Sequence, residues 1–171
     1  MNIIWHGHSC FEITGKDGTI VFDPYQANSV PGLNSLKLKA NLVLCSHEHD
    51  DHNARNCVEV APKDFKVTCI ETYHDHHQGS HRGKNTIHIV DFENLKVVHM
   101  GDIGCMMDDV SKLKNCDVLM IPIGGYYTID TKEALKYIER IQPRIVIPMH
   151  YHSHEFGYDV LSTNEEFIQQ S

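Results

Sequence analysis

The 171-residue sequence lacks the features that mark membrane and secreted proteins. No apolar run approaches the ~20 residues that a membrane-spanning helix needs. The N-terminus has neither the basic stretch nor the long apolar core of a secretory signal, so we expect a cytoplasmic protein. The six cysteines form no CxxC pair, which favours small buried side chains over a disulfide framework.

Basic residues are also scarce. Lysine and arginine total 15 against 23 acidic residues, the formal net charge is −8, and Lys and Arg form no run. This balance disfavours nonspecific nucleic-acid binding. With 41% hydrophobic residues and no repeat, residues 1–171 predict one globular domain with a substantial core. The sequence leaves the oligomeric state open.

Histidine, by contrast, is abundant, and three of the 14 histidines stand in the segment His47-Glu48-His49-Asp50-Asp51-His52. The segment follows the apolar run 42–45. Where a strand ends and a loop begins, the side chains at i and i+2 point the same way, so His47 and His49 can bind one ion. Asp51 and His52 can then face a second ion. Imidazoles with a carboxylate suit zinc or a similar divalent ion, with one position open for water.

Further candidate ligands stand where other apolar runs end. They are His74 after residues 67–73, Asp102 after residues 95–100, and His150 after residues 144–149. The runs predict short strands, and loops at strand ends can converge on one cleft. A structural zinc site would need no such scatter, so the pattern indicates a catalytic centre.

These motifs resemble the metallo-β-lactamase superfamily, in the branch of small L-ascorbate-6-phosphate-lactonase-like hydrolases. The resemblance covers nearly the whole chain. The superfamily's five motifs have counterparts in order: Asp23, the HxHxDH of residues 47–52, His74, Asp102 and His150. Segments 5–9, 82–85 and 122–128 carry the resemblance to the branch. It implies an α/β (α+β) fold, a four-layer αββα sandwich of two mixed sheets.

The resemblance also implies a role for each ligand. His47, His49 and His74 would hold one metal ion, Asp51, His52 and His150 a second, and Asp102 would bridge them. The cofactor is two divalent ions per chain, Zn²⁺ before Mn²⁺, Fe²⁺ or Ni²⁺. A hydroxide between them would be the nucleophile, and Asp51 would be the catalytic residue that takes its proton. His76 and His77 crowd His74 and leave the register of the third motif open.

Residues around the ligands have expected roles too. His8 and Asp23 would support the metal-bound imidazoles through hydrogen bonds. Four residues are candidates for substrate binding: Arg82 and Lys84 for a phosphate or carboxylate, and Tyr126 and Tyr127 for a ring. Solvated loop charges and core tyrosines are the alternatives for these four.

The expected function is a dinuclear metal-dependent hydrolase acting on a small anionic metabolite, with lactone or amide cleavage favoured. A metal-dependent phosphodiesterase is one alternative, because it needs the same hydroxide. A non-catalytic metal or metabolite sensor is another. A diiron oxidoreductase is disfavoured, since His49 stands where the diiron proteins of the superfamily carry a carboxylate. The partner is a small molecule, with no nucleic acid and no membrane.

Hydrophobic periodicity predicts the secondary structure. Strands are expected at 2–6, 10–14, 18–23, 65–73, 86–92, 95–101, 117–122 and 144–149, and helices at 108–115, 131–141 and 163–170. Residues 25–39 read as a loop at the lip of the cleft. Asp130 and Ser162 each precede a glutamate by three residues, a capping pattern that predicts two helix starts.

Overall fold

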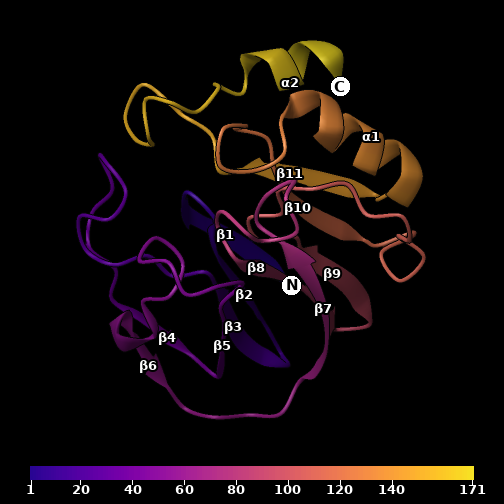
Figure 1. Ribbon diagram of the computed structural model, residues 1–171. Coiled ribbons are helices and arrows are strands. Elements are labelled where there is room, and N and C mark those ends of the chain that lie inside the picture. Colours follow the sequence, from indigo (N-terminus) through magenta and orange to yellow (C-terminus); the bar gives the residue numbers. More distant parts are fainter.

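The computed structural model describes residues 1–171 as two mixed β-sheets packed face to face (Figure 1). The first sheet has the order β1-β2-β3-β5, with strands Asn2–Gly7, Cys10–Gly15, Gly18–Phe22 and Leu42–Leu44. The second has the order β11-β10-β9-β8-β7, with strands Ile145–Met149, Val118–Pro122, Leu95–His99, Lys84–Phe92 and Lys66–Tyr73. A two-stranded ribbon pairs β4 (Leu38–Ala40) with β6 (Val58–Val60), which follows a short 3₁₀ helix, η1 (Arg55–Cys57).

Apolar side chains from alternate strand positions fill the space between the sheets. Phe11 and Phe22 of the first sheet pack with Val90, Val97 and Met120 of the second. Side chains alternate across a strand, so each strand also presents a second face that needs cover. This alternation explains why both sheets carry an outer layer.

The two outer layers differ. Helices α1 (Thr131–Ile141) and α2 (Glu165–Gln170) cover the outer face of the five-stranded sheet, where Tyr137 and Phe167 join its core (Figure 1). The ribbon β4–β6 and the loop after β3 cover the first sheet, with Val30 and Val58 packed on Val21. The expected fold class is confirmed, with coil and ribbon in place of helix on that side. No helix of the structure is long and apolar enough to cross a membrane.

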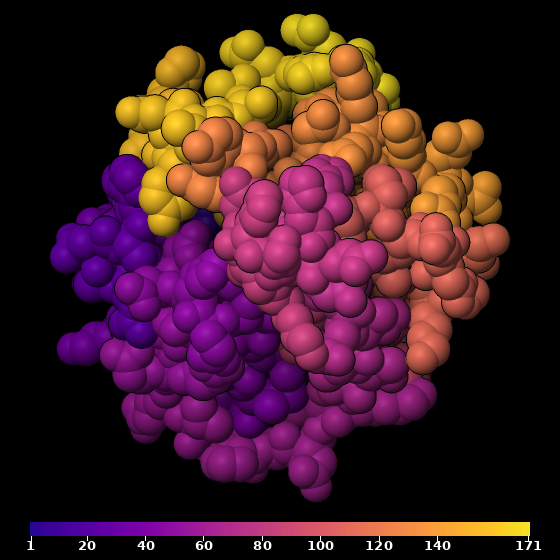
Figure 2. All heavy atoms as spheres, viewed as in Figure 1, coloured from indigo at the N-terminus to yellow at the C-terminus, as the bar shows by residue number.

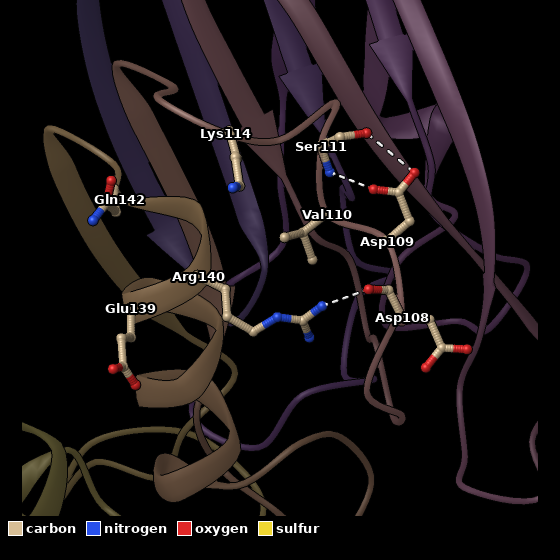
Figure 3. A pocket seen from close by; sticks show the side chains of 8 residues that line it. All are labelled: Asp108, Asp109, Val110, Ser111, Lys114, Glu139, Arg140 and Gln142. Carbon is tan, nitrogen blue, oxygen red and sulfur yellow. Dashed lines mark hydrogen bonds between the residues drawn. The ribbon is translucent and has the colours of Figure 1, made fainter.

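The expected strands are confirmed, but the helix expected at 108–115 is wrong. Residues 111–115 form only turns. The Asp109 carboxylate accepts hydrogen bonds from the amide and hydroxyl of Ser111, and Arg140 donates to the main-chain oxygen of Asp108 (Figure 3). Asn115 adopts a left-handed conformation at φ 54° and donates its N–H to Ile141. Local side-chain bonds therefore outcompete the helix.

Helix α1 has the capping box expected at Asp130, whereas α2 does not begin as expected. The Asp130 carboxylate accepts from the Glu133 amide at 2.9 Å, and the Glu133 carboxylate accepts from the Asp130 amide at 3.2 Å. The residue that precedes α2 is Asn164, while the Ser162 amide donates to Gly124 instead. The cap expected at Ser162 is wrong because its backbone is engaged with another loop.

We expect Asp130→Ala to lower the free energy of unfolding by about 1 kcal/mol, because the Glu133 amide loses the Asp130 carboxylate that accepts its hydrogen bond. Ser162→Ala is the matched control and should change it by no more than about 0.5 kcal/mol. Urea denaturation followed by circular dichroism measures both. Equal losses in the two variants would contradict the capping assignment.

Candidate metal centre

The candidate ligands gather at one edge of the sandwich because of strand direction. Strands β7, β9, β10 and β11 run the same way, as do β1, β3 and β5. Their carboxyl ends deliver the residues that follow them: His8, Asp23, the segment 47–52, His74, Asp102 and His150. In Figure 2, purple, pink, orange and yellow parts of the chain adjoin on one face. Segments far apart in the sequence thus share one site.

The buried carboxylate of Asp102 lies at the centre of the cluster. Its Oδ2 is 3.0 Å from Nε2 of His150, 3.1 Å from Nε2 of His52 and 3.3 Å from Nε2 of His74. Nε2 of His47 is 4.0 Å away. Two ligand groups flank this carboxylate, each with its ligating atoms within 4.8 Å of one another: His47, His49 and His74, and His8, Asp51, His52 and His150.

The residues present fit divalent cations. Nε2 of His47, Nε2 of His52 and Oδ1 of Asp102 are buried and have no hydrogen-bond partner. Buried polar atoms without partners are costly, and a cation among them would satisfy all three. Imidazole nitrogens and carboxylate oxygens are ligands that zinc and similar transition metals accept.

The pKa values of the imidazoles shift in different directions within the cluster. Burial, aided by the neighbouring His52, lowers the pKa of His47 to about 3. Burial and the neighbouring His150 lower the pKa of His8 to about 4. For His74, burial opposes the charged form, yet hydrogen bonding to Asp102 outweighs it and the pKa is raised. His47 is thus neutral near pH 7, the form that can bind metal, while a proton would compete with a cation at His74.

The carboxylate of Asp23 orients two of the imidazoles. It accepts hydrogen bonds from the amide and hydroxyl of Ser46, each at 2.6 Å, and from Nδ1 of His52 at 2.8 Å. The Ser46 hydroxyl lies 2.9 Å from Nδ1 of His47. Nδ1 of His74 in turn donates to the main-chain oxygen of Tyr127 at 3.1 Å. All three rings therefore point Nε2 into the cluster.

His8 is the member of the second ligand group whose ring contacts Asp51. Its ring is fully buried, and its Nε2 is 3.1 Å from Oδ2 of Asp51. The backbone of His8, Asp23 and His150 is left-handed, with φ of 53°, 42° and 52°. Such conformations are uncommon outside glycine and cluster at functional sites. Here each one follows a strand and turns a side chain into the cleft.

A cavity of about 250 Å³ opens beside the cluster. Its lining residues are His49, Asp51, His74, Arg82, Asp102, Tyr127, His150 and Tyr158. Of the four residues expected to bind substrate, Arg82 and Tyr127 line it. Tyr126 is 64% exposed and lines a neighbouring cavity. Lys84 does not reach the site, because its ammonium group pairs with Glu71 on the neighbouring strand at 2.9 Å.

The structure brings His74 into the cluster and leaves its neighbours outside. His76 is exposed, with Nε2 3.7 Å from Glu133. The exposed His77 ring lies against His81, with centroids 4.3 Å apart. This arrangement favours the register in which His74 is the third motif.

Sequence reasoning missed two residues of the site. The Tyr158 hydroxyl donates to the Ser29 main chain at 2.6 Å and lies 3.5 Å from Oδ2 of Asp51. No pattern in the C-terminal segment signals this contact, which depends on loop packing. Asn85 accepts from the Asp102 amide at 2.8 Å and donates to Met100. Asn85 lies in the segment 82–85, which supported the resemblance to the family branch but did not indicate that Asn85 contacts Asp102.

We expect His74→Ala to lower metal affinity by more than the 10–100-fold that a lost supporting contact costs. His77→Ala is the control, because its ring lies outside the cluster. Elemental analysis after dialysis at limiting free metal compares the two variants. Full occupancy in His74→Ala together with loss in His77→Ala would show that the third motif is out of register.

Comparisons with known proteins agree with this arrangement. The model of the beta-lactamase superfamily domain matches residues 2–150. A UPF0173 metal-dependent hydrolase of Thermoplasma acidophilum is 28% identical over 204 aligned residues, covering 97% of this chain and 88% of the relative. Another, from Staphylothermus marinus, is 30% identical and covers 86% of this chain and 82% of the relative.

A solved structure extends the agreement to the fold. A protein of the metallo-β-lactamase superfamily from Thermotoga maritima superposes with a TM-score of 0.78 and 27% identity, covering 99% of this chain and 84% of that one. These matches confirm the expected superfamily and the expected enzyme class, while the narrower lactonase-like branch stays a prediction. The chain therefore belongs to the UPF0173 metal-dependent hydrolase family of the metallo-β-lactamase superfamily.

Proposed function

We propose that this metal-dependent hydrolase works with two divalent ions on a small anionic metabolite. One observation carries the proposal: the Asp102 carboxylate lies within 3.0 to 3.3 Å of imidazole nitrogens from three separate segments. It stands between two groups of ligating atoms, each compact enough for one ion. A carboxylate placed there can bridge two cations and offset their mutual repulsion.

In this proposal His47, His49 and His74 would hold one ion, Asp51, His52 and His150 would hold the other, and Asp102 would contact both. Zn²⁺ fits this donor set, and Mn²⁺, Fe²⁺ or Ni²⁺ are alternatives. Two ions bound there would supply a hydroxide near neutral pH and polarise the oxygen of the bond to be cleaved.

The side chains around the ions would then direct the chemistry. Asp51, whose Oδ2 lies 3.1 Å from Nε2 of His8, would accept a hydrogen bond from the attacking water and take its proton. The Tyr127 main chain keeps the His74 ring in place. Arg82, which lines the same cavity, provides a positive charge for an anionic group of the substrate.

The size of the cavity supports a small substrate. Its volume of about 250 Å³ is below the range of about 300–1,000 Å³ typical of drug-sized ligands. Lactone or amide cleavage is our first choice, in keeping with the resemblance to the lactonase-like branch. A phosphodiester is the alternative, because the same hydroxide can attack phosphorus. A sensor without catalysis is the other alternative, and we rank it lower because a merely structural ion would need no open position beside it.

The proposal takes residues 1–171 as one catalytic unit acting in the cytoplasm. All six cysteines are free: two are buried, three are half-buried and one is exposed. Free thiols of this kind suit a reducing compartment.

The test is elemental analysis of protein purified without chelator, followed by hydrolysis assays on panels of lactones, amides and phosphodiesters. We expect about two equivalents of divalent metal. Asp102→Ala should loosen both ions and lower hydrolysis by at least ~100-fold, because the bridge and its charge are lost. Turnover of phosphodiesters alone would select the alternative chemistry.

Cys105→Ala is the matched control, three residues from Asp102. Its thiol makes only a weak contact with the main-chain oxygen of Tyr73, at 3.8 Å, so metal content and rate should stay near wild type. Equal losses in the two variants would mean that fold damage explains both. A steady single equivalent of metal that His150→Ala leaves unchanged would contradict the dinuclear site.

A further inference from the structure

The loop between β7 and β8 is organised by one buried carboxylate, that of Asp75. The side chain is only 2% exposed and has no cationic partner. Instead it accepts four main-chain N–H bonds: His77 at 2.7 Å and Gly79 at 3.0 Å on Oδ1, His81 at 3.0 Å and Arg82 at 2.7 Å on Oδ2. A carboxylate that accepts hydrogen bonds from four main-chain amides fixes the backbone conformation of the loop.

The last amide in this set belongs to Arg82, the only lysine or arginine that lines the metal cavity. The loop lies beside the segment that precedes α1 (Figure 1), and Cζ of Arg82 is 5.4 Å from the ring centroid of Tyr127 and 5.8 Å from that of Tyr126. These contacts hold the guanidinium from one side.

The guanidinium of Arg82 has no acceptor in the protein. The side chain is half-buried, yet none of its N–H groups makes a hydrogen bond and no carboxylate lies within 4.0 Å of it. The ammonium group of Lys84, by contrast, forms an ion pair with Glu71. A half-buried guanidinium with unused donors, facing the cavity of a hydrolase, is suited to a planar or tetrahedral anionic oxygen group.

We propose that Asp75 is a positioning residue that holds Arg82 as a preformed receptor for a carboxylate or phosphate group of the substrate. The inference rests on the proposed function and narrows its substrate class. Fixing the Arg82 backbone in advance reduces the conformational entropy lost when the anion binds. The enzyme should therefore favour substrates that carry an anionic group over neutral ones with the same scissile bond.

Asp75→Asn is the sharpest variant, because asparagine keeps the shape and one acceptor oxygen while replacing the other by an NH₂ group. Two of the four amides then lose their acceptor. Amide hydrogen exchange of the metal-loaded enzyme should become about tenfold or more faster at two of positions 77, 79, 81 and 82. Asp109→Asn, whose carboxylate serves only Ser111, is the matched control and should leave these amides unchanged.

The second measurement is the dissociation constant of the metal-loaded enzyme for inorganic phosphate and, separately, for acetate, measured by titration calorimetry in every variant, with the Nε–Hε resonance of Arg82 followed in those that keep Arg82. We expect at least one anion to shift this resonance and to bind about tenfold more weakly in Arg82→Lys, which lacks the guanidinium fork. Asp75→Asn should weaken binding in the same direction, and Asp109→Asn should not.

Unchanged dissociation constants in both Asp75→Asn and Arg82→Lys would overturn the proposal, because the metal ions alone would then hold the anion. Unchanged exchange in Asp75→Asn would overturn the positioning role. Neither readout needs turnover, and metal content is measured on the same samples. Failure of the proposed hydrolase function would appear as absent metal or absent turnover. It is therefore distinguishable from failure of the proposal for Asp75 and Arg82.

Discussion

The buried carboxylate of Asp23 is the interaction on which the rest of the site depends. Parallel pairing of β3 with β5 places it beside the start of the metal-binding segment, where it binds Ser46 and His52. Burial opposes its ionisation, but the neighbouring His52 and His99 imidazoles outweigh burial and hold the pKa of Asp23 well below its usual range. The carboxylate thus stays charged and keeps His52 with Nδ1 occupied and Nε2 free.

The fold explains why ligands 100 residues apart can meet. Strands that run in the same direction end at the same edge, so the residue after each strand enters the same cleft. Left-handed backbone at His8, Asp23 and His150 then turns these side chains inward. The sheets supply rigidity, since the strands are paired and packed on both faces, and the loops that follow the strands line the cavity.

The sequence was informative where local pattern decides the structure. The strands follow from the apolar runs, and the candidate ligands at their ends follow from the histidines and aspartates that stand where these runs stop. The sequence was misleading where contacts with neighbouring residues determine the structure. Asp109 and Asn115 keep the segment 108–115 in turns instead of a helix. Lys84 pairs with Glu71 on the adjacent strand instead of reaching the cavity. The sequence was silent on Tyr158 and on the loop anchored by Asp75, because contacts between distant loops leave no periodic signal.

The central claim is that two cations share the Asp102 carboxylate. Anomalous X-ray diffraction from crystals of the metal-loaded protein, recorded on both sides of the absorption edge of the bound metal, tests it most directly. The account predicts two anomalous peaks ~3.5–4 Å apart, one near His47, His49 and His74 and the other near Asp51, His52 and His150, with Asp102 between them. A single peak at this cluster, or a second peak elsewhere on the surface, would contradict the account.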